Sequence, residues 1–282
     1  DTLLILNVDD ARMPVTYGID HSVGGTNGLI GAPAIDNDIT KFGLSSMKFG
    51  GAVDTGVTTT GAGGDFLKQA ASDKWNFGTG DFTVETWIYK TENQDQPVVG
   101  NSTAAIAPGN GSCWRMKTGT INVTHANLKF GTGGADHITS HADHNFTLHE
   151  WHHVAAVRDN GTLSLYIDGV SAQTPVANTT DYNQRNELWV GAVHDLLTTS
   201  MYTGYIDDLR ISNVARYSGA TFSLPTEPHV ADSNTLTLFR METNQLNVTL
   251  PPSPIANDVI NIWDIGGKCA TNPIHLLRNG KK

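Results

Sequence analysis

One stretch of the sequence, EWHHVAAVRDNGTLSLYIDG at residues 150–169, limits the fold more than any other. Two runs of alternating apolar residues flank Asp159-Asn160-Gly161, and Asn and Gly accept the positive φ of a tight turn at little cost. The pattern predicts a β-hairpin over residues 154–167. Both faces of residues 154–157 are largely apolar, as in a strand that is covered on both sides. The hairpin therefore indicates a layered β structure.

The two adjacent histidines in this stretch, His152 and His153, are the first candidates for a chemical site. Neighbouring residues of an extended strand point to opposite faces, so the pair cannot ligate one ion together. We expect one imidazole to fill core space or to bond a backbone carbonyl, and the other to face a neighbouring strand. No positioned carboxylate or nucleophile is evident beside either ring. The pair is therefore interpreted as part of the fold.

Other short segments alternate in the same way and predict further strands. No long amphipathic helix interrupts them, and charged residues make up only 16% of a chain with 29 glycines, a composition typical of strands joined by tight turns. The sequence predicts an all-β fold, a two-sheet antiparallel jelly-roll sandwich. The predicted strands outside the hairpin are 3–8, 46–49, 82–89, 113–116, 127–130, 187–190, 204–211 and 235–241.

The chain is long enough for one sandwich with a small appendage. Similar strand patterns at residues 1–10 and 232–243 are interpreted as the first and last strands of one domain, 1–243; the start of a second, truncated domain is the alternative. A proline-rich linker at 250–254 opens a C-terminal extension, 244–282, which is too short to form its own core. We expect this extension to lie against the sandwich or a neighbouring subunit.

Charge and hydropathy exclude several classes of partner. The formal net charge of -10 is unlike that of nucleic-acid-binding proteins, and no apolar run is long enough to span a bilayer. Cys113 and Cys269 lack the spacing of a cysteine zinc site, and the sequence leaves open whether they form a disulfide or stay reduced.

Several segments in a fixed order resemble one family. They are FGLSSMKFGGA (42–52), GDFTVETWIY (80–89), the hairpin stretch, ELWVGA (187–192) and GYIDDLRISNVARYS (204–218). Over residues 3–241 the chain is similar to laminin G-like, concanavalin A-like jelly-roll domains of secreted, cell-surface and phage virion proteins. Members bind glycans, bind proteins or act as structural spacers. In this fold Trp87 and Trp151 are expected to fill the core, and Gly204 to stand where a side chain would obstruct packing.

Catalytic patterns were sought and are absent from the sequence. The Glu-x-Asp-x-x-Glu strand of related glucanases is missing, and Asp207 and Asp208 are adjacent strand residues that point to opposite faces, so a structural use is expected for both. The histidine-rich segment at residues 137–144 is interpreted as a solvated loop, with a transition-metal site as the alternative. The chain is therefore predicted not to be an enzyme.

Calcium is the metal that the resemblance implies, because laminin G-like and pentraxin-like domains often hold it on a rim. Asp195 lies where pentraxins carry an acid after a strand end, with Asn110 or Asp95 as partners from the facing loop. A second candidate is the cluster of Asp36, Asn37 and Asp38. Carboxylate and amide oxygens are suitable ligands for calcium.

The expected function is a non-enzymatic surface module that binds carbohydrate or a protein partner through rim loops, in an extracellular or virion assembly. A purely structural subunit of a fibre, shell or capsid decoration, assembled through residues 244–282, is the first alternative. A glycoside hydrolase is the second, and it would require two carboxylates in one cleft.

Overall fold

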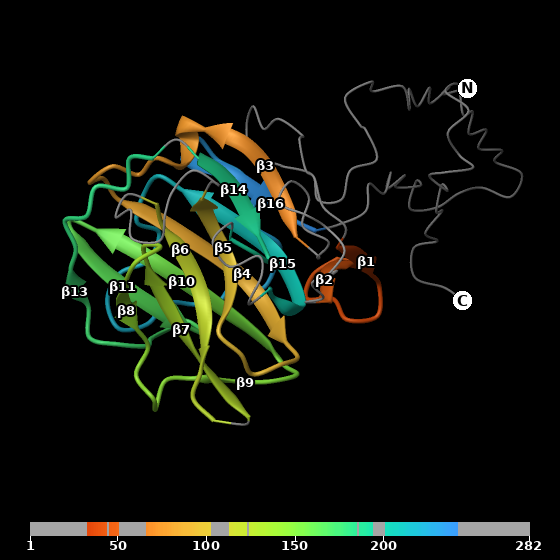
Figure 1. Ribbon diagram of the computed structural model, residues 1–282. Helices are drawn as coiled ribbons and strands as arrows, with labels where there is room; N and C mark the ends of the chain where they lie inside the picture. The colour runs from red at the N-terminus through yellow and green to blue at the C-terminus, as the bar shows by residue number, and fades with distance from the viewer. Residues whose placement is uncertain are drawn as a thin grey trace, which may run out of the picture. The chain divides into compact units, whose positions relative to one another are not determined.

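The computed structural model describes residues 33–43, 45–50, 66–102, 113–122, 124–184, 186–193 and 201–241 (Figure 1). All of them belong to one compact unit, Thr16–Glu242. The strand predicted at residues 3–8 and the extension at 244–282 lie outside the described residues.

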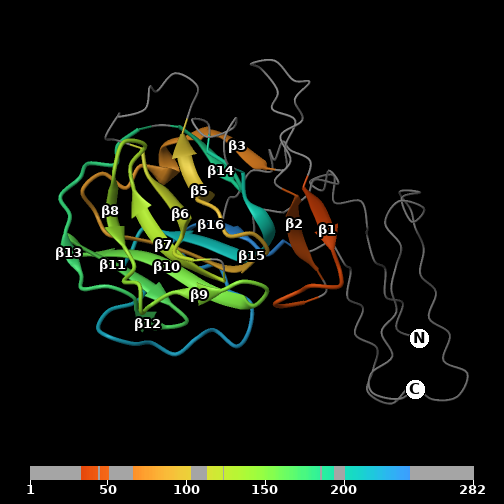
Figure 2. The same ribbon diagram turned by 60° about the horizontal axis from the view of Figure 1, so that its bottom comes forward.

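Two antiparallel sheets face each other and make up nearly all of the described structure (Figures 1 and 2). The first sheet has the order β1 (Ala34–Asp36), β2 (Ser46–Gly50), β15 (Thr203–Ser212), β4 (Phe82–Lys90), β10 (Trp151–Asp159), β11 (Thr162–Ile167) and β12 (Val170–Ser171). In addition, β13 (Val176–Ala177) pairs with β11, and β16 (Thr235–Phe239) pairs with β15.

The second sheet has the order β3 (Leu67–Ser72), β14 (Asn186–Val190), β5 (Gln96–Ser102), β6 (Arg115–Thr120), β7 (His125–Gly131) and β8 (Asp136–Thr139), with β9 (Phe146–Thr147) paired to β7. One 3-10 turn, η1 (Asp73–Trp75), follows β3. These two sheets confirm the predicted all-β jelly-roll sandwich.

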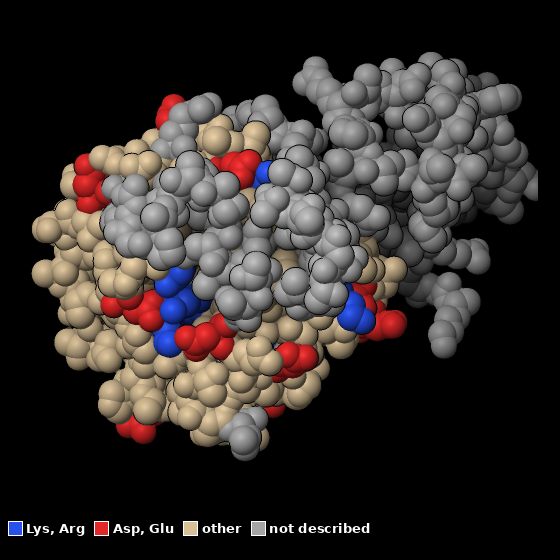
Figure 3. Space-filling view, viewed as in Figure 1, with Lys and Arg blue, Asp and Glu red and all other residues tan. Residues whose placement is uncertain are grey.

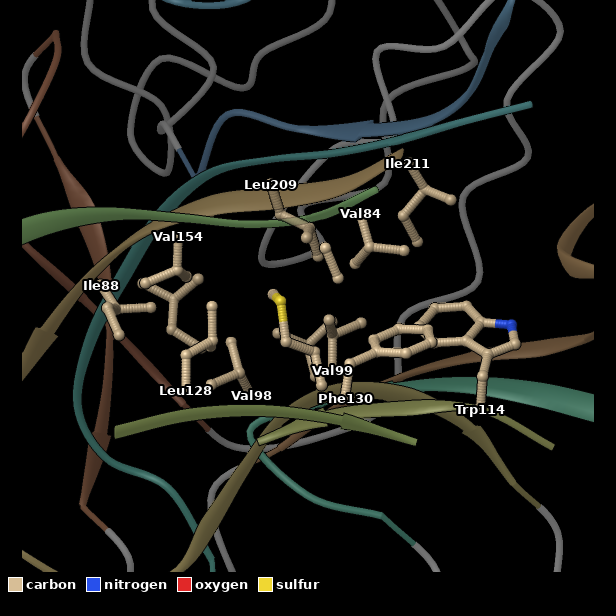
Figure 4. Packing of buried hydrophobic residues seen from close by; sticks show 14 of the residues in the cluster. Val84, Ile88, Val98, Val99, Trp114, Leu128, Phe130, Val154, Leu209 and Ile211 are labelled. Carbon is tan, nitrogen blue, oxygen red and sulfur yellow. The ribbon is translucent and has the colours of Figure 1, made fainter. Parts of the chain in front are cut away.

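The main core lies between the two sheets (Figure 4). Apolar side chains of β4, β10 and β15 point at those of β5, β6 and β7, and each removes its apolar surface from water. The labelled residues are all between 0 and 1% exposed: Val84, Ile88, Val98, Val99, Trp114, Leu128, Phe130, Val154, Leu209 and Ile211. This packing positions the hairpin on which the candidate site is built.

The predicted hairpin is confirmed. Strand β10 pairs with β11 from Val154↔Ile167 to Asp159↔Thr162. Asn160 and Gly161 have φ of 48° and 73°, which is the left-handed pair that a two-residue turn requires. Sequence patterns missed the short or polar strands β1, β3, β5, β8, β9, β12 and β13.

The outer face of the first sheet is covered by the connection between β15 and β16, residues 213–234, which we call the covering segment. Ala155, Val157 and Tyr166 pack there against its Ala215, Tyr217 and Phe222. Figure 2 shows this segment in blue running past β12. The cover explains why both faces of β10 are apolar, as predicted.

The predicted core tryptophans differ in their surroundings. Trp87 is 2% exposed but lies outside the cluster between the sheets, and its ring contacts Phe42 and His153. Trp151 is only half-buried, beside Tyr89 at the start of β10, so its prediction as a core residue is wrong. An aromatic at a strand end has fewer neighbours than one in the middle of a strand.

Gly204 is confirmed as a position that excludes a side chain. Its φ is 136°, and a Cβ there would lie 2.1 Å from the backbone oxygen of Tyr89. Replacing Gly204 with alanine is expected to lower the free energy of unfolding by about 3 kcal/mol, because the strand must shift and the backbone is strained. Urea unfolding monitored by tryptophan fluorescence measures this change. The matched variant Gly219→Ala also has a positive φ but open space around it, so it isolates the clash.

Two further observations bear on the chain's setting. No helix within the described residues is long and apolar enough to cross a membrane. Cys113 is buried, whereas Cys269 lies outside the described residues, so their pairing stays open.

Candidate functional site

An open groove of about 800 Å³ lies against β11, beside the hairpin turn. Leu163, Leu165 and Ile167 of β11 pack into the core. Because side chains alternate along a strand, the residues between them point to the opposite face. Thr162, Ser164 and Tyr166 therefore line the groove. The remaining lining residues come from the turn at 159–160, from segments 171–175 and 217–220, and from His141 and His144.

The groove offers hydrogen-bonding groups with little charge. Its polar side chains carry hydroxyl, amide and imidazole groups, and Asp159 is the single acid among its lining residues, which include no lysine, arginine or glutamate. Such a surface suits a neutral ligand rich in hydroxyl groups better than an anion. Its volume lies within the range of small-ligand sites.

Two tyrosines fix the side of the groove formed by the covering segment. The Tyr166 hydroxyl donates to the carbonyl of Gly219 at 3.0 Å. The Tyr217 ring stacks on Phe222 with centroids 3.6 Å apart, and its hydroxyl donates to Glu85 Oε2 at 2.6 Å. The shape of the groove is therefore tied to residues buried beneath it.

Beneath this side lies a buried polar cluster, which consists of Glu85, His153, Asp208, Arg210 and His229. Glu85 and His153 are 0% exposed, Asp208 is 1% and His229 is 5% exposed. Arg210 contacts Glu85 Oε1 at 2.7 Å, and the Nε2 atoms of both histidines lie 3.2 Å from Glu85 Oε2. Strands β4, β10 and β15 and the covering segment each supply part of the cluster.

Charges within this cluster shift the protonation of its members. Although burial alone raises the pKa of Glu85, contacts with His153, His229 and Arg210 hold it well below its usual range. Burial alone lowers the pKa of His229, but the Asp208 and Glu85 carboxylates raise it to about 9. The cluster therefore stabilises a carboxylate and a protonated imidazole at neutral pH.

The opposite orientation predicted for His152 and His153 is confirmed, but the expected absence of a carboxylate beside them is wrong. His152 Nδ1 lies 2.6 Å from Asp168 Oδ2, and His153 lies beside Glu85. Asp168 follows β11 at the hairpin exit and has a φ of 50°, and Glu85 belongs to the neighbouring strand β4. Sequence reasoning missed both contacts because they depend on turn geometry and cross-strand register.

The two adjacent acids of β15 have structural roles, as predicted. Asp207 Oδ2 accepts hydrogen bonds from the backbone of Lys41 and Phe42, and burial raises its pKa to about 8. Asp208 has a φ of 51° at an irregularity in the strand, and it accepts from the backbone N–H of His229 at 2.8 Å. Neither acid lines the groove.

Over the residues that it describes, the structure does not bring the calcium candidates together. Asp195 and Asn110 lie outside them. Asp36 Oδ1 accepts backbone N–H bonds from Asp38 and Ile39, each at 3.0 Å, as in a simple turn. Calcium binding at these positions stays a prediction.

The remaining candidate, Asp95, is surrounded by cations. Its carboxylate lies 3.1 Å from Lys129 Nζ and 3.9 Å from Lys117 Nζ, and these lysines also approach Asp136. Figure 3 shows basic atoms flanked by acidic ones on this face of the molecule. Hydrogen bonding and charge from Lys129 lower the pKa of Asp95, although burial opposes this.

The histidines of the histidine-rich segment lie in two different surroundings. His141 and His144 border the groove, and His141 is 58% exposed at its side chain. His137 instead packs inward, where its Nδ1 lies 2.9 Å from the Tyr182 hydroxyl. Within the described residues, a single group of three His, Cys, Asp or Glu side chains converges closely enough to hold a metal, and it is Glu85, His153 and His229 rather than this segment.

Comparison with known families gives one match. A laminin G-like family model, described as concanavalin A-like lectin/glucanases superfamily, matches residues 62–219. A search of curated proteins finds no relative of the chain.

Three solved structures with a related architecture come from different kinds of protein. A heptameric SAP-like pentraxin from Limulus polyphemus is 15% identical, with 69% of this chain and 94% of that chain covered and a TM-score of 0.46. Domain 4 of an extracellular arabinanase from Geobacillus stearothermophilus, in complex with arabinotriose, is 15% identical, with coverages of 73% and 82% and a TM-score of 0.42. The enzymatically active domain of tailspike protein 2 from bacteriophage CBA120 is 8% identical, with coverages of 84% and 35% and a TM-score of 0.47. At these scores the likenesses say nothing about what this chain binds.

Proposed function

Because this chain belongs to the laminin G-like family of the concanavalin A-like lectin/glucanases superfamily, we propose that it is a non-enzymatic binding module that holds carbohydrate in the groove along β11. The observation that carries this proposal is the lining of the groove, in which hydroxyl, amide and imidazole groups surround a space of about 800 Å³ and no lysine, arginine or glutamate stands among the described lining residues. A neutral sugar can exchange its hydrogen bonds with water for bonds to these groups.

The proposal of a non-catalytic module draws on the carboxylates of the groove. Catalysis of glycoside hydrolysis requires two carboxyl groups on either side of the scissile bond. Asp159 is the one carboxylate in the groove's lining. As the resemblance to secreted and virion domains implies, we propose that the module acts outside the cell or on a virion. Assembly through residues 244–282 is the alternative, and this segment lies outside the described residues.

The first test is a glycan array probed with the full chain, followed by calorimetry on any sugar that binds. Thr162→Val and Ser164→Ala each remove one hydroxyl that faces the groove, and each is expected to weaken binding by about tenfold. Failure of every neutral glycan to bind, or unchanged affinity in both variants, would count against the groove as the site.

A matched threonine provides the control. Thr91 follows β4 at the strand end that pairs with Trp151, whereas the groove lies at the Asp159 end of β10. Thr91→Val is therefore expected to leave binding unchanged. Repeating the array with a chelator tests the calcium proposal, because calcium-dependent binding would be restored by Ca²⁺ and not by Zn²⁺.

A further inference from the structure

Three side chains of the buried polar cluster converge on one point. Their ligand atoms, the Nε2 atoms of His153 and His229 and Oε2 of Glu85, all lie within 4.8 Å of one another. Each nitrogen is 3.2 Å from the oxygen. Zinc at its usual bond lengths, about 2.0–2.1 Å, in a tetrahedron sets neighbouring ligand atoms about 3.3 Å apart. The two nitrogen–oxygen distances are therefore close to those between neighbouring ligands in such a tetrahedron.

The ring nitrogens of the two histidines lie beside carboxylates, but not in hydrogen-bonding geometry. None of the four ring nitrogens of His153 and His229 has a hydrogen bond of acceptable geometry within the described residues. Buried polar atoms normally have a partner, and leaving one unpaired costs about 1–3 kcal/mol. A metal ion between the rings and the carboxylate would displace the extra proton of His229 and satisfy both Nε2 atoms at once.

The surrounding groups occupy the places that orient metal ligands. Asp208 Oδ2 lies 2.5 Å from His229 Nδ1, so a small rotation of the ring lets this N–H donate to the carboxylate. A carboxylate behind a histidine fixes the ring and raises its basicity as a ligand. Arg210 holds the other oxygen of Glu85, and Tyr217 donates to Oε2, which keeps a second lone pair.

We propose that Glu85, His153 and His229 supply three ligands of a site for a divalent transition metal, zinc by their type and spacing, with water as the fourth ligand. Two imidazoles and one carboxylate favour such an ion over calcium, which takes oxygen ligands. The ion connects β4 and β10 to the covering segment. Tyr217 donates to Glu85 and also lines the groove, so it links the metal site to the side of the groove. The site stands independently of carbohydrate binding.

The decisive experiment uses the full chain refolded without metal and titrated with Co²⁺ and then Zn²⁺. We expect one Co²⁺ per chain with the visible absorption of tetrahedral coordination, its displacement by Zn²⁺, and a higher Tm with either ion. A wild-type chain that binds no Co²⁺ and shows no change in Tm would overturn the proposal and leave the cluster as a purely ionic one.

Variants then locate the ion. His229→Gln is expected to abolish the tetrahedral Co²⁺ absorption, and Glu85→Gln to weaken it. The matched control is the double variant His141→Gln/His144→Gln, which removes exposed imidazoles and is expected to keep the spectrum. Loss of binding in this control, or its persistence in folded His229→Gln, would place the ion elsewhere and refute the site. If His229→Gln does not fold, the wild-type titration and the exposed-histidine control still decide the question.

Discussion

Replacing Arg158 with methionine is expected to lower the free energy of unfolding by about 4 kcal/mol. Arg158 is 0% exposed, and its guanidinium donates to the carbonyls of Gly78, Gly80 and Thr180 at 2.7 Å each and to the amide oxygen of Asn178 at 3.2 Å. Methionine fills much of the same volume but leaves these acceptors without a donor. Calorimetric Tm and urea unfolding measure the loss.

The guanidinium joins two loops, because the oxygen atoms that accept its hydrogen bonds belong to both of them. It lies 5.0 Å from the ring centroids of both Phe82 and Tyr182, and no carboxylate pairs with it in the described parts of the chain. Burial lowers its pKa, although an arginine remains charged at neutral pH. Lysine cannot form this fork, so Arg158→Lys should recover little of the stability.

A second arginine serves as the control. Arg216 pairs with Asp232 at 2.7 Å, where the carboxylate is 48% exposed. Arg216 also donates to the Ser212 hydroxyl at 2.6 Å, but its acceptors include a carboxylate that solvent reaches, so Arg216→Met should cost less than Arg158→Met. Equal losses in the two variants would contradict the role given to the buried hydrogen bonds.

The second large effect is a dependence of stability on pH that comes from Lys90. Its side chain is 1% exposed, its ammonium contacts the neutral Gln96 side chain, and burial lowers its pKa to about 7. The unfolded chain holds this proton up to its ordinary pKa of 10.5. Between these two pKa values the unfolded state binds more protons than the folded state. The free energy of unfolding therefore decreases as the pH falls towards 7.

Lys90→Met removes this titration. Below pH 7 the variant is expected to be more stable than the wild type by on the order of 4 kcal/mol, and the difference should vanish above about pH 10. Urea unfolding at a series of pH values gives the difference, in which the effects of other titrating groups cancel. The matched lysine control is Lys68→Met, which removes a partly exposed ion pair with Glu187. A flat difference for Lys90→Met would contradict the shifted pKa.

The hairpin and the two-sheet architecture could be predicted, although not every strand, because their signals are local. Alternating apolar residues and the Asp159-Asn160-Gly161 turn identify β10 and β11 without knowledge of their neighbours. The same alternation places Arg158 on the face of Val154 and Ala156. It could not reveal the acceptors of Arg158, because Gly78 and Thr180 come from distant loops.

The candidate sites were less predictable, since they depend on which segments meet. Nothing in the pattern around His229 indicates that it returns to Glu85, 144 positions earlier in the chain, to complete a cluster on the outer face of the first sheet. The signal that could have been used was the apolar outer face of β10, which requires a cover, and the covering segment supplies both Tyr217 and His229. For ligand binding, the sequence led only to the expectation of rim loops, without particular residues.

The covering segment also determines where a ligand can bind. It closes the outer face over β4 and β10, while Thr162 and Ser164 at the far side of the same sheet remain in the groove. The groove is therefore the part of this face that the connection leaves open. Insertions or deletions in one loop could widen, narrow or close the groove while the two sheets stay unchanged. Ligand preference in such a domain can thus diverge rapidly among variants that share the same stable scaffold.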